Sequence, residues 1–382
     1  MALWDELTGQ ADAIAIVEAA AEASSVGGSG DASMTHSWLI TGPPGSGRSN
    51  LAYAFAAALL GGDEATQRQV NARTHPDLGV LSTERVIISI EEVRQLVASS
   101  QFSPSVGRYR VMVIEDADRM TERTSNVLLK ALEEPPPRTV WILCAPSEAD
   151  LIPTIRSRVR TVRLRVPDIT EVAQLLERRD GVDAATATRA AREAQSHIGM
   201  AHRLATNAEA RGRRERTLSI ALGIRSVSDA VLASVSLLEL AKADAEAITE
   251  ERDSEERDAA MRSLGIEPGG TIPPALRSQL KALDEDQKRR ATRSLRDGID
   301  RIMVDLLSLY RDILLLQLGV GGEPINLSIL RDLESAAASA TAPQTLGTMD
   351  AIAIARRRIE SNVAPALALD AMLVTAIRKP AR

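Results

Sequence analysis

The sequence predicts an α/β domain with a parallel sheet and a phosphate-binding loop, followed by helical regions. Short apolar runs in the first part of the chain alternate with helical patterns, as expected for parallel strands joined by crossover helices. Beyond Pro167 apolar residues recur at helical spacing. We therefore expect three domains: a P-loop core at 1–166, a small helical domain at 167–210 and a larger helical domain at 211–382.

The first predicted elements surround the strongest motif of the chain. The alanine-rich segment 4–22 predicts a helix, and the Gly- and Ser-rich tract 24–33 predicts a loop. An apolar run at 38–40 predicts a buried strand, and an alanine-rich helix is expected at 51–60. The turn between them follows the phosphate-loop pattern G-x-x-x-x-G-K-[ST], with Gly42, Gly47 and Ser49 at its fixed positions and Gly45 inside it.

Arg48 stands where this pattern requires lysine. In a phosphate loop, backbone N–H groups point at the phosphate and the following helix adds its positive dipole end. The loop lysine is a compact ammonium that fits among phosphate oxygens, whereas a guanidinium is a bulky planar fork. The substitution argues against a working hydrolase site. Two interpretations stay open: a retained or vestigial nucleotide site, and a glycine turn without a ligand.

The remaining elements of the predicted core follow from apolar runs and helix signals. A turn is expected at 74–77, where Pro76 lacks a hydrogen-bond donor and Asp77 can cap. Four further strands are expected at 86–90, 110–114, 139–144 and 161–166. Helices are expected at 91–99, 124–134 and 151–158, and the proline run 135–137 ends the second of them.

Two acidic residues, Glu115 and Asp116, come directly after the strand predicted at 110–114. A P-loop fold holds Mg²⁺ and orients water at such a strand end, so these residues are candidates for the second half of a nucleotide site. Active members of this class have aspartate first and glutamate second, and here the order is reversed. For Asp116 or Asp118 an acidic helix cap is an equally good interpretation.

The rest of the chain predicts helices at 169–178 and 184–205, with the best pattern at 295–318. The apolar stripe of this last helix consists of Leu295, Ile299, Ile302, Met303, Leu306, Tyr310 and Ile313. Loops are expected at 265–274 and 319–324, and a final helix pair at 349–378. The sequence assigns no role to the polar segment 250–290.

Composition limits the classes of function. The 382 residues are 44% hydrophobic, which is ample for buried cores, and the net charge of −6 argues against autonomous nucleic-acid binding. Cys144 is the only cysteine, which excludes an intrachain disulfide and a multi-cysteine zinc site and fits a reducing compartment. No apolar run reaches ~18 residues, and the start of the chain lacks a signal-peptide pattern, so we expect a cytoplasmic protein without a membrane partner.

One stretch departs from the acidic charge balance. From 155 to 165 there is no acidic residue, and the five arginines are Arg156, Arg158, Arg160, Arg163 and Arg165. A solvated face is the usual explanation of such a run. Its position beside a nucleotide-type core also suits a surface that meets phosphates bound by another subunit.

With these motifs placed, the chain resembles the delta-prime subunit family of the bacterial DNA polymerase III clamp loader, which belongs to the AAA+ class. The resemblance rests on HSWLITGPPGSGRS, THPDL, IISIEEVRQL, GRYRVMVIEDADRMTERTSNVLLKALEEPP and LIPTIRSRVR. NVAPALALDAML near the end resembles the collar helices of that family. Together these blocks are highly specific, and they are densest over 36–166.

The resemblance implies an AAA+ core with a degenerate ATP site, a helical lid and an oligomerising collar. Family members act in a hetero-pentamer with the clamp-loader ATPase subunits and the delta subunit, which opens a sliding clamp and places it on primed DNA. The delta-prime subunit is a stator that need not hydrolyse ATP. Its serine-arginine-cysteine motif falls here on Ser157, Arg158 and Val159. The resemblance therefore makes Arg158 an arginine finger that acts on a neighbour's ATP; the alternative role is a surface salt bridge.

Several departures from the family pattern concern ligands. Segment 61–73 lacks the cysteines of the zinc module that many relatives carry, so no zinc or other metal is expected. Met200 occupies the position of a lid arginine in ATP-using relatives, and Arg203 is out of register with that pattern. Together with Arg48 and the reversed acids, these changes predict weak or absent ATP hydrolysis. No cofactor is required, and ATP binding is left open.

Three hypotheses remain distinguishable. The first is a ring subunit without independent enzymatic activity, which works inside the polymerase holoenzyme through protein contacts and Arg158. The second is an active AAA+ motor subunit, which turnover by the isolated chain would support. The third is an autonomous DNA-binding protein that uses the arginine run, which salt-dependent binding by the monomer would support.

Overall fold

The computed structural model describes residues 4, 7–25, 34–83, 87–263 and 277–377. The chain forms two compact units, Met1–Thr206 and Asn207–Arg382. The first contains a sheet and helices, and in the second the described elements are helical. This confirms the predicted class, an α/β core with a parallel sheet followed by helical regions.

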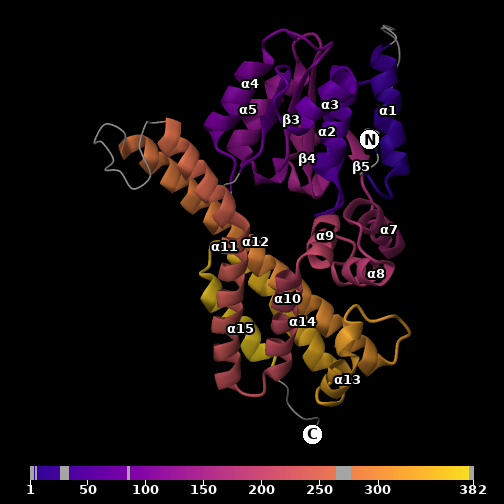
Figure 1. Cartoon of the computed structure of the whole chain (residues 1–382), viewed down its shortest axis with the longest axis vertical. Helices are drawn as coiled ribbons and strands as arrows, with labels where there is room; N and C mark the ends of the chain where they lie inside the picture. The colour runs from indigo at the N-terminus through magenta and orange to yellow at the C-terminus, as the bar shows by residue number, and fades with distance from the viewer. Residues whose placement is uncertain (1–3, 5–6, 26–33, 84–86, 264–276, 378–382) are drawn as a thin grey trace. The chain divides into compact units, whose positions relative to one another are not determined.

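The sheet of the first unit contains five described strands, all paired in parallel (Figure 1). They are β1 (Ser37–Thr41), β2 (Leu78–Leu81), β3 (Arg110–Ile114), β4 (Thr139–Ala145) and β5 (Arg160–Arg163). Their order is β2-β3-β4-β1-β5. The register pairs Ile114 with Leu143 and Thr41 with Ala145, so the carboxyl ends of β3, β4 and β1 reach the same edge. The loops that follow β1 and β3 therefore start from one edge of the sheet.

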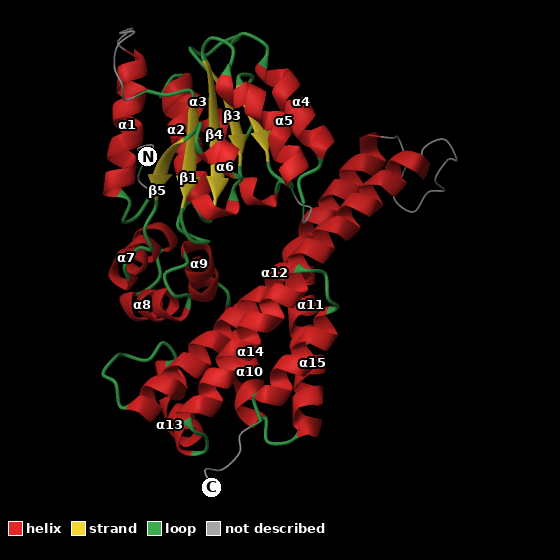
Figure 2. Cartoon of the chain, turned by 180° about the vertical axis from the view of Figure 1, so that it is seen from behind, coloured by secondary structure: helices red, strands yellow, loops and turns green. Residues whose placement is uncertain are grey.

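Helices cover both faces of this sheet (Figure 2). They are α1 (Ala11–Ser25), α2 (Arg48–Leu60), α3 (Glu64–Asn71), α4 (Ile90–Ser100), α5 (Glu122–Glu133) and the short α6 (Pro153–Arg156). Because side chains alternate along a strand, β1 supplies both faces. Trp38 and Ile40 pack in the cluster that contains α1 and α2, and Leu39 packs in the cluster that contains α4 and α5.

Three more helices complete the first unit: α7 (Ile169–Asp180), α8 (Ala184–Glu193) and α9 (Ile198–Thr206). They share a hydrophobic cluster of their own, which includes Val172 and Leu204. The helix expected over 184–205 is wrong as a single element. It breaks because Gln195 and Ser196 take positive φ angles of 50° and 62°. The division at residues 166 and 210 stays a prediction.

The strand expected at 86–90 is also wrong. Val86 lies outside the described residues, and Ile88 makes only an isolated bridge with Met120. Ser89 instead forms a capping box with Glu92 and starts α4 at Ile90. The true second strand is β2, which follows the expected turn at 74–77. Two short 3-10 turns, at Ala117–Arg119 and Glu148–Asp150, follow β3 and β4.

The second unit consists of packed helices. They are α10 (Ala208–Gly223), α11 (Val227–Ser263), α12 (Arg277–Leu318), α13 (Leu330–Ala338), α14 (Ala342–Glu360) and α15 (Pro365–Thr375), with a 3-10 turn at Leu327–Ile329. The predicted apolar stripe of α12 is buried from Ile299 to Ile313, although this helix begins earlier than expected. The expected helix pair near the end corresponds to α14 and α15. The loops predicted at 24–33 and 265–274 fall largely or wholly outside the described residues.

A buried polar cluster holds the loop before α13 against α12. Asp312 is fully buried and accepts hydrogen bonds from the backbone N–H groups of Ile325 (3.1 Å) and Asn326 (2.8 Å). The Asn326 side chain accepts from Arg214 Nη2 at 2.6 Å, which ties α10 to the same cluster. Within the described ranges no helix is both long and apolar enough to cross a membrane.

Asp77 anchors the turn before β3 and is fully buried. Its carboxylate accepts hydrogen bonds from the backbone N–H groups of Ser105 (2.6 Å), Val106 (2.7 Å) and Gly107 (2.7 Å). Burial by itself raises the pKa of Asp77, but these donors favour the charged form more strongly and lower the pKa to about 2. The charged carboxylate therefore stabilises the junction between β2 and β3.

Replacing this carboxylate should destabilise the fold and change its acid sensitivity. We expect Asp77→Asn to lose about 2 kcal/mol of unfolding free energy at neutral pH. Because the folded pKa lies below that of the unfolded chain, the stabilisation is complete above about pH 4 and is lost as the pH falls toward 2. Urea denaturation at several pH values would measure this. Asp63→Asn is the matched control, since Asp63 is an exposed helix cap and asparagine caps equally well. Equal losses for both variants would contradict the prediction.

Candidate functional site

The candidate phosphate loop connects β1 to α2 and consists of residues 42–47. Gly45 and Gly47 have φ angles of 79° and 93°, in the left-handed region that favours glycine. A Cβ on Gly42 would lie 2.7 Å from Ser46 Oγ, so the loop is tightly wound. Its sequence pattern thus corresponds to a real strand-loop-helix turn with special backbone conformations.

Arg48, the first residue of α2, folds back onto this loop. Its Nη1 donates a hydrogen bond of 2.8 Å to the carbonyl oxygen of Gly42, at the opposite end of the loop. The guanidinium therefore closes the turn internally instead of presenting a free ammonium to a phosphate. One buried hydroxyl of the loop, Ser46 Oγ, has no hydrogen-bond partner in the described part of the chain.

Other segments of the first unit also contact the loop. The backbone N–H of Ile198, at the start of α9, donates to Gly45 O at 3.3 Å. The His197 ring lies so close that a Cβ on Gly45 would be 2.3 Å from it. On the amino-terminal side, buried Gln10 donates through Nε2 to Ser46 O at 3.4 Å and to Arg165 O at 2.9 Å. The loop is thus a junction between α9, the amino-terminal segment and the sheet.

The structure brings Glu115 and Ser49 together at the carboxyl edge of the sheet. Ser49 Oγ donates to Glu115 Oε2 at 3.4 Å. The other carboxylate oxygen, Oε1, accepts from the Tyr53 hydroxyl and lies 2.7 Å from Arg73 Nη2. Burial and the neighbouring Glu115 carboxylate raise the pKa of Tyr53, so its hydroxyl stays protonated as the donor. Glu115 is therefore held by three side chains of its own chain.

Asp116, the next residue, is at the cap position of the 3-10 turn after β3 and makes no side-chain capping bond. Its Oδ2 is 3.6 Å from Arg119 Nε. Burial, followed by repulsion from Asp116, raises the pKa of the nearby Asp118 carboxyl. In the described ranges no group of three or more His, Cys, Asp or Glu side chains has the arrangement of a metal site. Cys144 is buried on β4, and burial raises its pKa, so it is an unreactive thiol.

Arg158 lies just after α6, which ends at Arg156. Its Nη1 donates to Thr154 O at 2.7 Å and to Ser157 Oγ at 2.9 Å, while Nε donates to Glu133 Oε1 at 2.6 Å. The Arg158 side chain is one-third exposed. Ser157 thus positions the guanidinium, and Glu133 on α5 is its counter-ion.

The other arginines of the predicted run are mostly engaged as well. Arg163 Nη2 pairs with Glu148 at 2.9 Å, and Arg165 Nη2 pairs with Glu171 at 2.5 Å. Arg160 stacks over the Trp38 ring, with its guanidinium carbon 5.1 Å from the ring centroid. The Glu148 and Glu171 carboxylates thus offset the positive charges of Arg163 and Arg165.

Part of the first unit is similar in sequence to named protein families. Residues 29–168 match the family model described as DNA polymerase III, delta subunit. The delta-prime subunit from Pseudomonas aeruginosa is 36% identical over 140 residues, which are 34% of this chain and 43% of that protein. The delta-prime subunit from Escherichia coli is 31% identical over 143 residues, 35% of this chain and 43% of that protein.

The α/β region of this chain is thus similar to that family over residues 29–168. A tau/gamma subunit of DNA polymerase III from Haemophilus influenzae is similar too, with 30% identity over 158 residues, 38% of this chain and 22% of that protein. The matched region spans less than half of these relatives. Among solved structures, a gamma-subunit-related protein from Thermotoga maritima covers 94% of this chain and 98% of itself, with 18% identity and a TM-score of 0.41.

Sequence reasoning missed four side chains of the site: Gln10, Tyr53, Arg73 and His197. They reach the loop or Glu115 from segments distant in sequence, and none lies in a recognised motif. Arg73 carries the clearest signal that was available, because it ends a polar stretch shortly before the THPDL block. Its contact with Glu115 became visible only through the fold.

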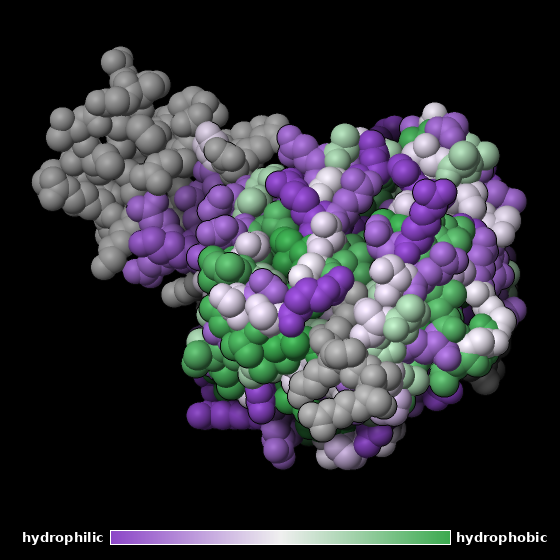
Figure 3. Space-filling model, turned by 90° about the horizontal axis from the view of Figure 1, so that it is seen from below, coloured by the Kyte–Doolittle hydropathy of each residue, from purple (hydrophilic) through white to green (hydrophobic). Residues whose placement is uncertain are grey.

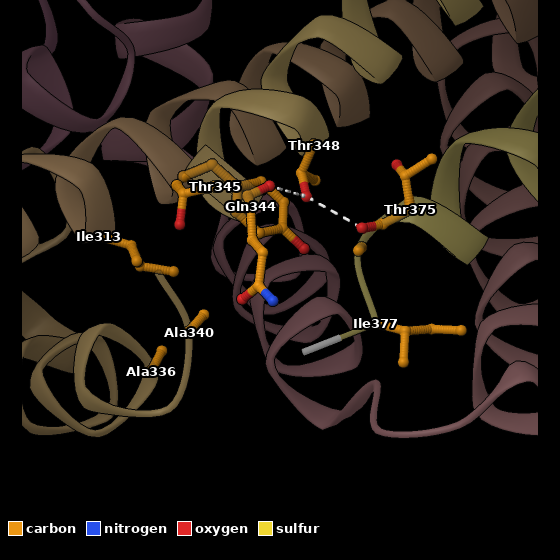
Figure 4. A pocket seen from close by; sticks show the side chains of 10 residues that line it. Ile313, Ala336, Ala340, Gln344, Thr345, Thr348, Thr375 and Ile377 are labelled. Carbon is orange, nitrogen blue, oxygen red and sulfur yellow. Dashed lines mark hydrogen bonds between the residues drawn. The ribbon is translucent and has the colours of Figure 1, made fainter. Parts of the chain in front are cut away.

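The second unit has a small cavity between α12, α13, α14 and α15 (Figure 4). The hydroxyl groups of Thr345 and Thr348, which line it, already form hydrogen bonds within the protein. The Thr348 hydroxyl lies within hydrogen-bonding distance of Gln344 O (3.1 Å) and Thr375 O (3.2 Å), and Thr345 Oγ1 donates to Gln317 Oε1 (2.9 Å). These bonds join the helices to one another, so the cavity is a packing feature and not a candidate site.

The contact between Gly45 and His197 can be tested with two glycine variants. We expect Gly45→Ala to lose about 2 kcal/mol more unfolding free energy than Gly62→Ala, because the new methyl group would overlap the His197 ring. Gly62 is the matched control: its φ of 74° carries the same backbone strain, and no atom lies within 4 Å of the added Cβ. Urea denaturation would give both values. Adding His197→Ala to Gly45→Ala should remove the difference, and an unchanged difference would refute the contact.

Proposed function

We propose that this chain is a non-hydrolysing subunit of a DNA polymerase III clamp loader. It helps load the sliding clamp onto primed DNA and supplies Arg158 to the ATP site of a neighbouring ATPase subunit. The observation that carries this proposal is the setting of Arg158. Its guanidinium lies at the surface, positioned by Ser157 and the end of α6, within the block LIPTIRSRVR. A guanidinium held in this way can stabilise charge on a transferring phosphoryl group.

The geometry of the chain's own loop supports the non-hydrolysing role. Arg48 donates to Gly42 O, and Glu115 is held by Tyr53 and Arg73. A working P-loop site needs its basic residue and its strand-end acid directed at the nucleotide and its metal. Both groups are directed at the protein instead.

The proposed partners are the ATPase subunits and the delta subunit of a hetero-pentamer, and the clamp and the primed DNA are reached through that complex. The second unit offers a surface for assembly, because Val227, Leu232 and Val235 on α11 and Leu367 on α15 are more than half exposed. These two helices pack against each other. Figure 3 shows green hydrophobic residues among purple hydrophilic ones on the face of the molecule seen from below. Exposed apolar patches of this kind are typical of protein interfaces.

Two alternatives remain as candidates. An active AAA+ motor subunit would use the proximity of Ser49 to Glu115, which lie 3.4 Å apart at the loop. An autonomous DNA-binding protein would use the arginine run. The Glu148 and Glu171 partners of Arg163 and Arg165 argue against the second alternative, because paired arginines attract a phosphate backbone less.

The finger can be tested in a clamp loader reconstituted with the other subunits from the same organism. We expect Arg158→Ala to reduce clamp- and DNA-stimulated ATP hydrolysis by ~10³-fold or more at the one site it serves, and to impair clamp loading. Arg158→Lys should restore little, because lysine lacks the planar fork. Arg163→Ala is the matched control from the same run and should leave the rate unchanged.

The isolated chain should show no ATP turnover, measured by phosphate release. If the Arg158→Ala complex kept full activity while the isolated chain hydrolysed ATP, the non-hydrolysing role would be wrong. Residues 42–49 would then be a motor site despite Arg48.

A further inference from the structure

The surroundings of Glu115 do not fit the metal ion that a P-loop fold implies at this position. Mg²⁺ requires near-octahedral oxygen ligands at 2.0–2.1 Å, and it usually keeps several waters. Here one carboxylate oxygen accepts from Tyr53 and is paired with Arg73 Nη2 at 2.7 Å, and the other accepts from Ser49. The Glu115 side chain is only 14% exposed. A divalent ion would have to displace a cation that is already present.

The cation already present is the Arg73 guanidinium, and both its charge and its geometry suit it to pair with Glu115. Its guanidinium carbon lies 5.4 Å from the centroid of the Tyr53 ring, and the Tyr53 hydroxyl donates to the same oxygen that Arg73 meets. The ring therefore supports the guanidinium through a cation–π contact while its hydroxyl shares the carboxylate. Ser49 and Tyr53, one turn apart on α2, and Arg73, after α3, thus converge on one acid.

The backbone at Arg73 supplies an independent observation. Arg73 follows the carboxyl end of α3 with a φ of 57°, in the left-handed region. Glycine is the usual residue at this position of a helix end, and a side chain there costs free energy. Backbone conformation therefore disfavours arginine at residue 73. The side-chain contact with Glu115 is the feature of the fold that offsets this cost.

We propose that Arg73 is a built-in counter-ion of Glu115 and takes over the charge role of a metal in this degenerate site. The pair links the end of α3 to the end of β3 and keeps this edge of the sheet folded without Mg²⁺ or nucleotide. The proposal concerns the isolated chain and does not depend on membership of a clamp loader.

The test compares thermal unfolding of the isolated chain and its variants with and without millimolar Mg²⁺. The wild-type midpoint should be unaffected by Mg²⁺. Arg73→Gly should lower the midpoint by about 3 °C or more, although glycine relieves the backbone, and Mg²⁺ should restore part of that loss. Arg73→Lys should stay closer to wild type, since it keeps the charge. Arg68→Ala is the matched control: Arg68 pairs with Glu64 on the exposed face of α3, and its loss should change the midpoint little.

A second set of variants, made in the Glu115→Gln protein, distinguishes loss of the Arg73–Glu115 ion pair from general destabilisation of the fold. In Glu115→Gln the acid is neutral, so adding Arg73→Gly should cause no further loss, and Mg²⁺ should have no effect on the double variant. The proposal would be overturned if Arg73→Gly were as stable as wild type or more stable, because Arg73 would then be only a strained helix-end residue. Stabilisation of the wild type by Mg²⁺ that disappears in Glu115→Gln would also overturn it.

Discussion

The parallel register of the sheet is the constraint on which the candidate site depends. Because β1, β4 and β3 run in the same direction and end at neighbouring register positions, the loop after β1 and the acid after β3 start from one edge. The buried strand β4 lies between them and fixes their separation. Ser49 on α2 can therefore reach Glu115, although 66 residues separate them in the chain. The contacts of Glu115 with Ser49, Tyr53 and Arg73 are built on that edge.

Within this framework, charges near the sheet ends are satisfied by the protein. The Asp77 carboxylate is held by backbone donors of residues 105–107, Glu115 is held by Tyr53 and Arg73, and Arg48 bonds to Gly42 O. Charged groups with partners inside the chain rigidify this part of the fold. Internal pairing of this kind fixes the positions of these side chains without a ligand. In the loop, the buried hydroxyl of Ser46 has no such partner among the described residues.

Sequence reasoning predicted the elements whose signals are local and missed those that depend on tertiary contacts. β1, β3 and β4 were predictable because each is a buried apolar run, and Gly42–Ser49 because its pattern is contiguous. β2 was missed because Leu78–Leu81 is a short edge strand. The β-branched run at 87–90 resembles a strand in sequence, but Ser89 caps α4 and Ile90 begins that helix. The break at Gln195 has no glycine to signal it. The positions of His197 and Arg73 depend on packing between distant segments, which periodicity cannot reveal.

Two arginines of the first unit illustrate how burial of the acidic partner decides what an ion pair can do. Arg73 meets a carboxylate that is 14% exposed and shared with Tyr53, so its removal leaves a poorly solvated charge without its cation. Arg158 meets Glu133, which is 46% exposed, and a pair of that kind contributes only ~0–1 kcal/mol. Exchanging Glu133 for the several charges of a phosphate would therefore cost little. Arg73 is held in place because its partner Glu115 is largely buried. Arg158 can exchange its partner more easily, because Glu133 is exposed to water.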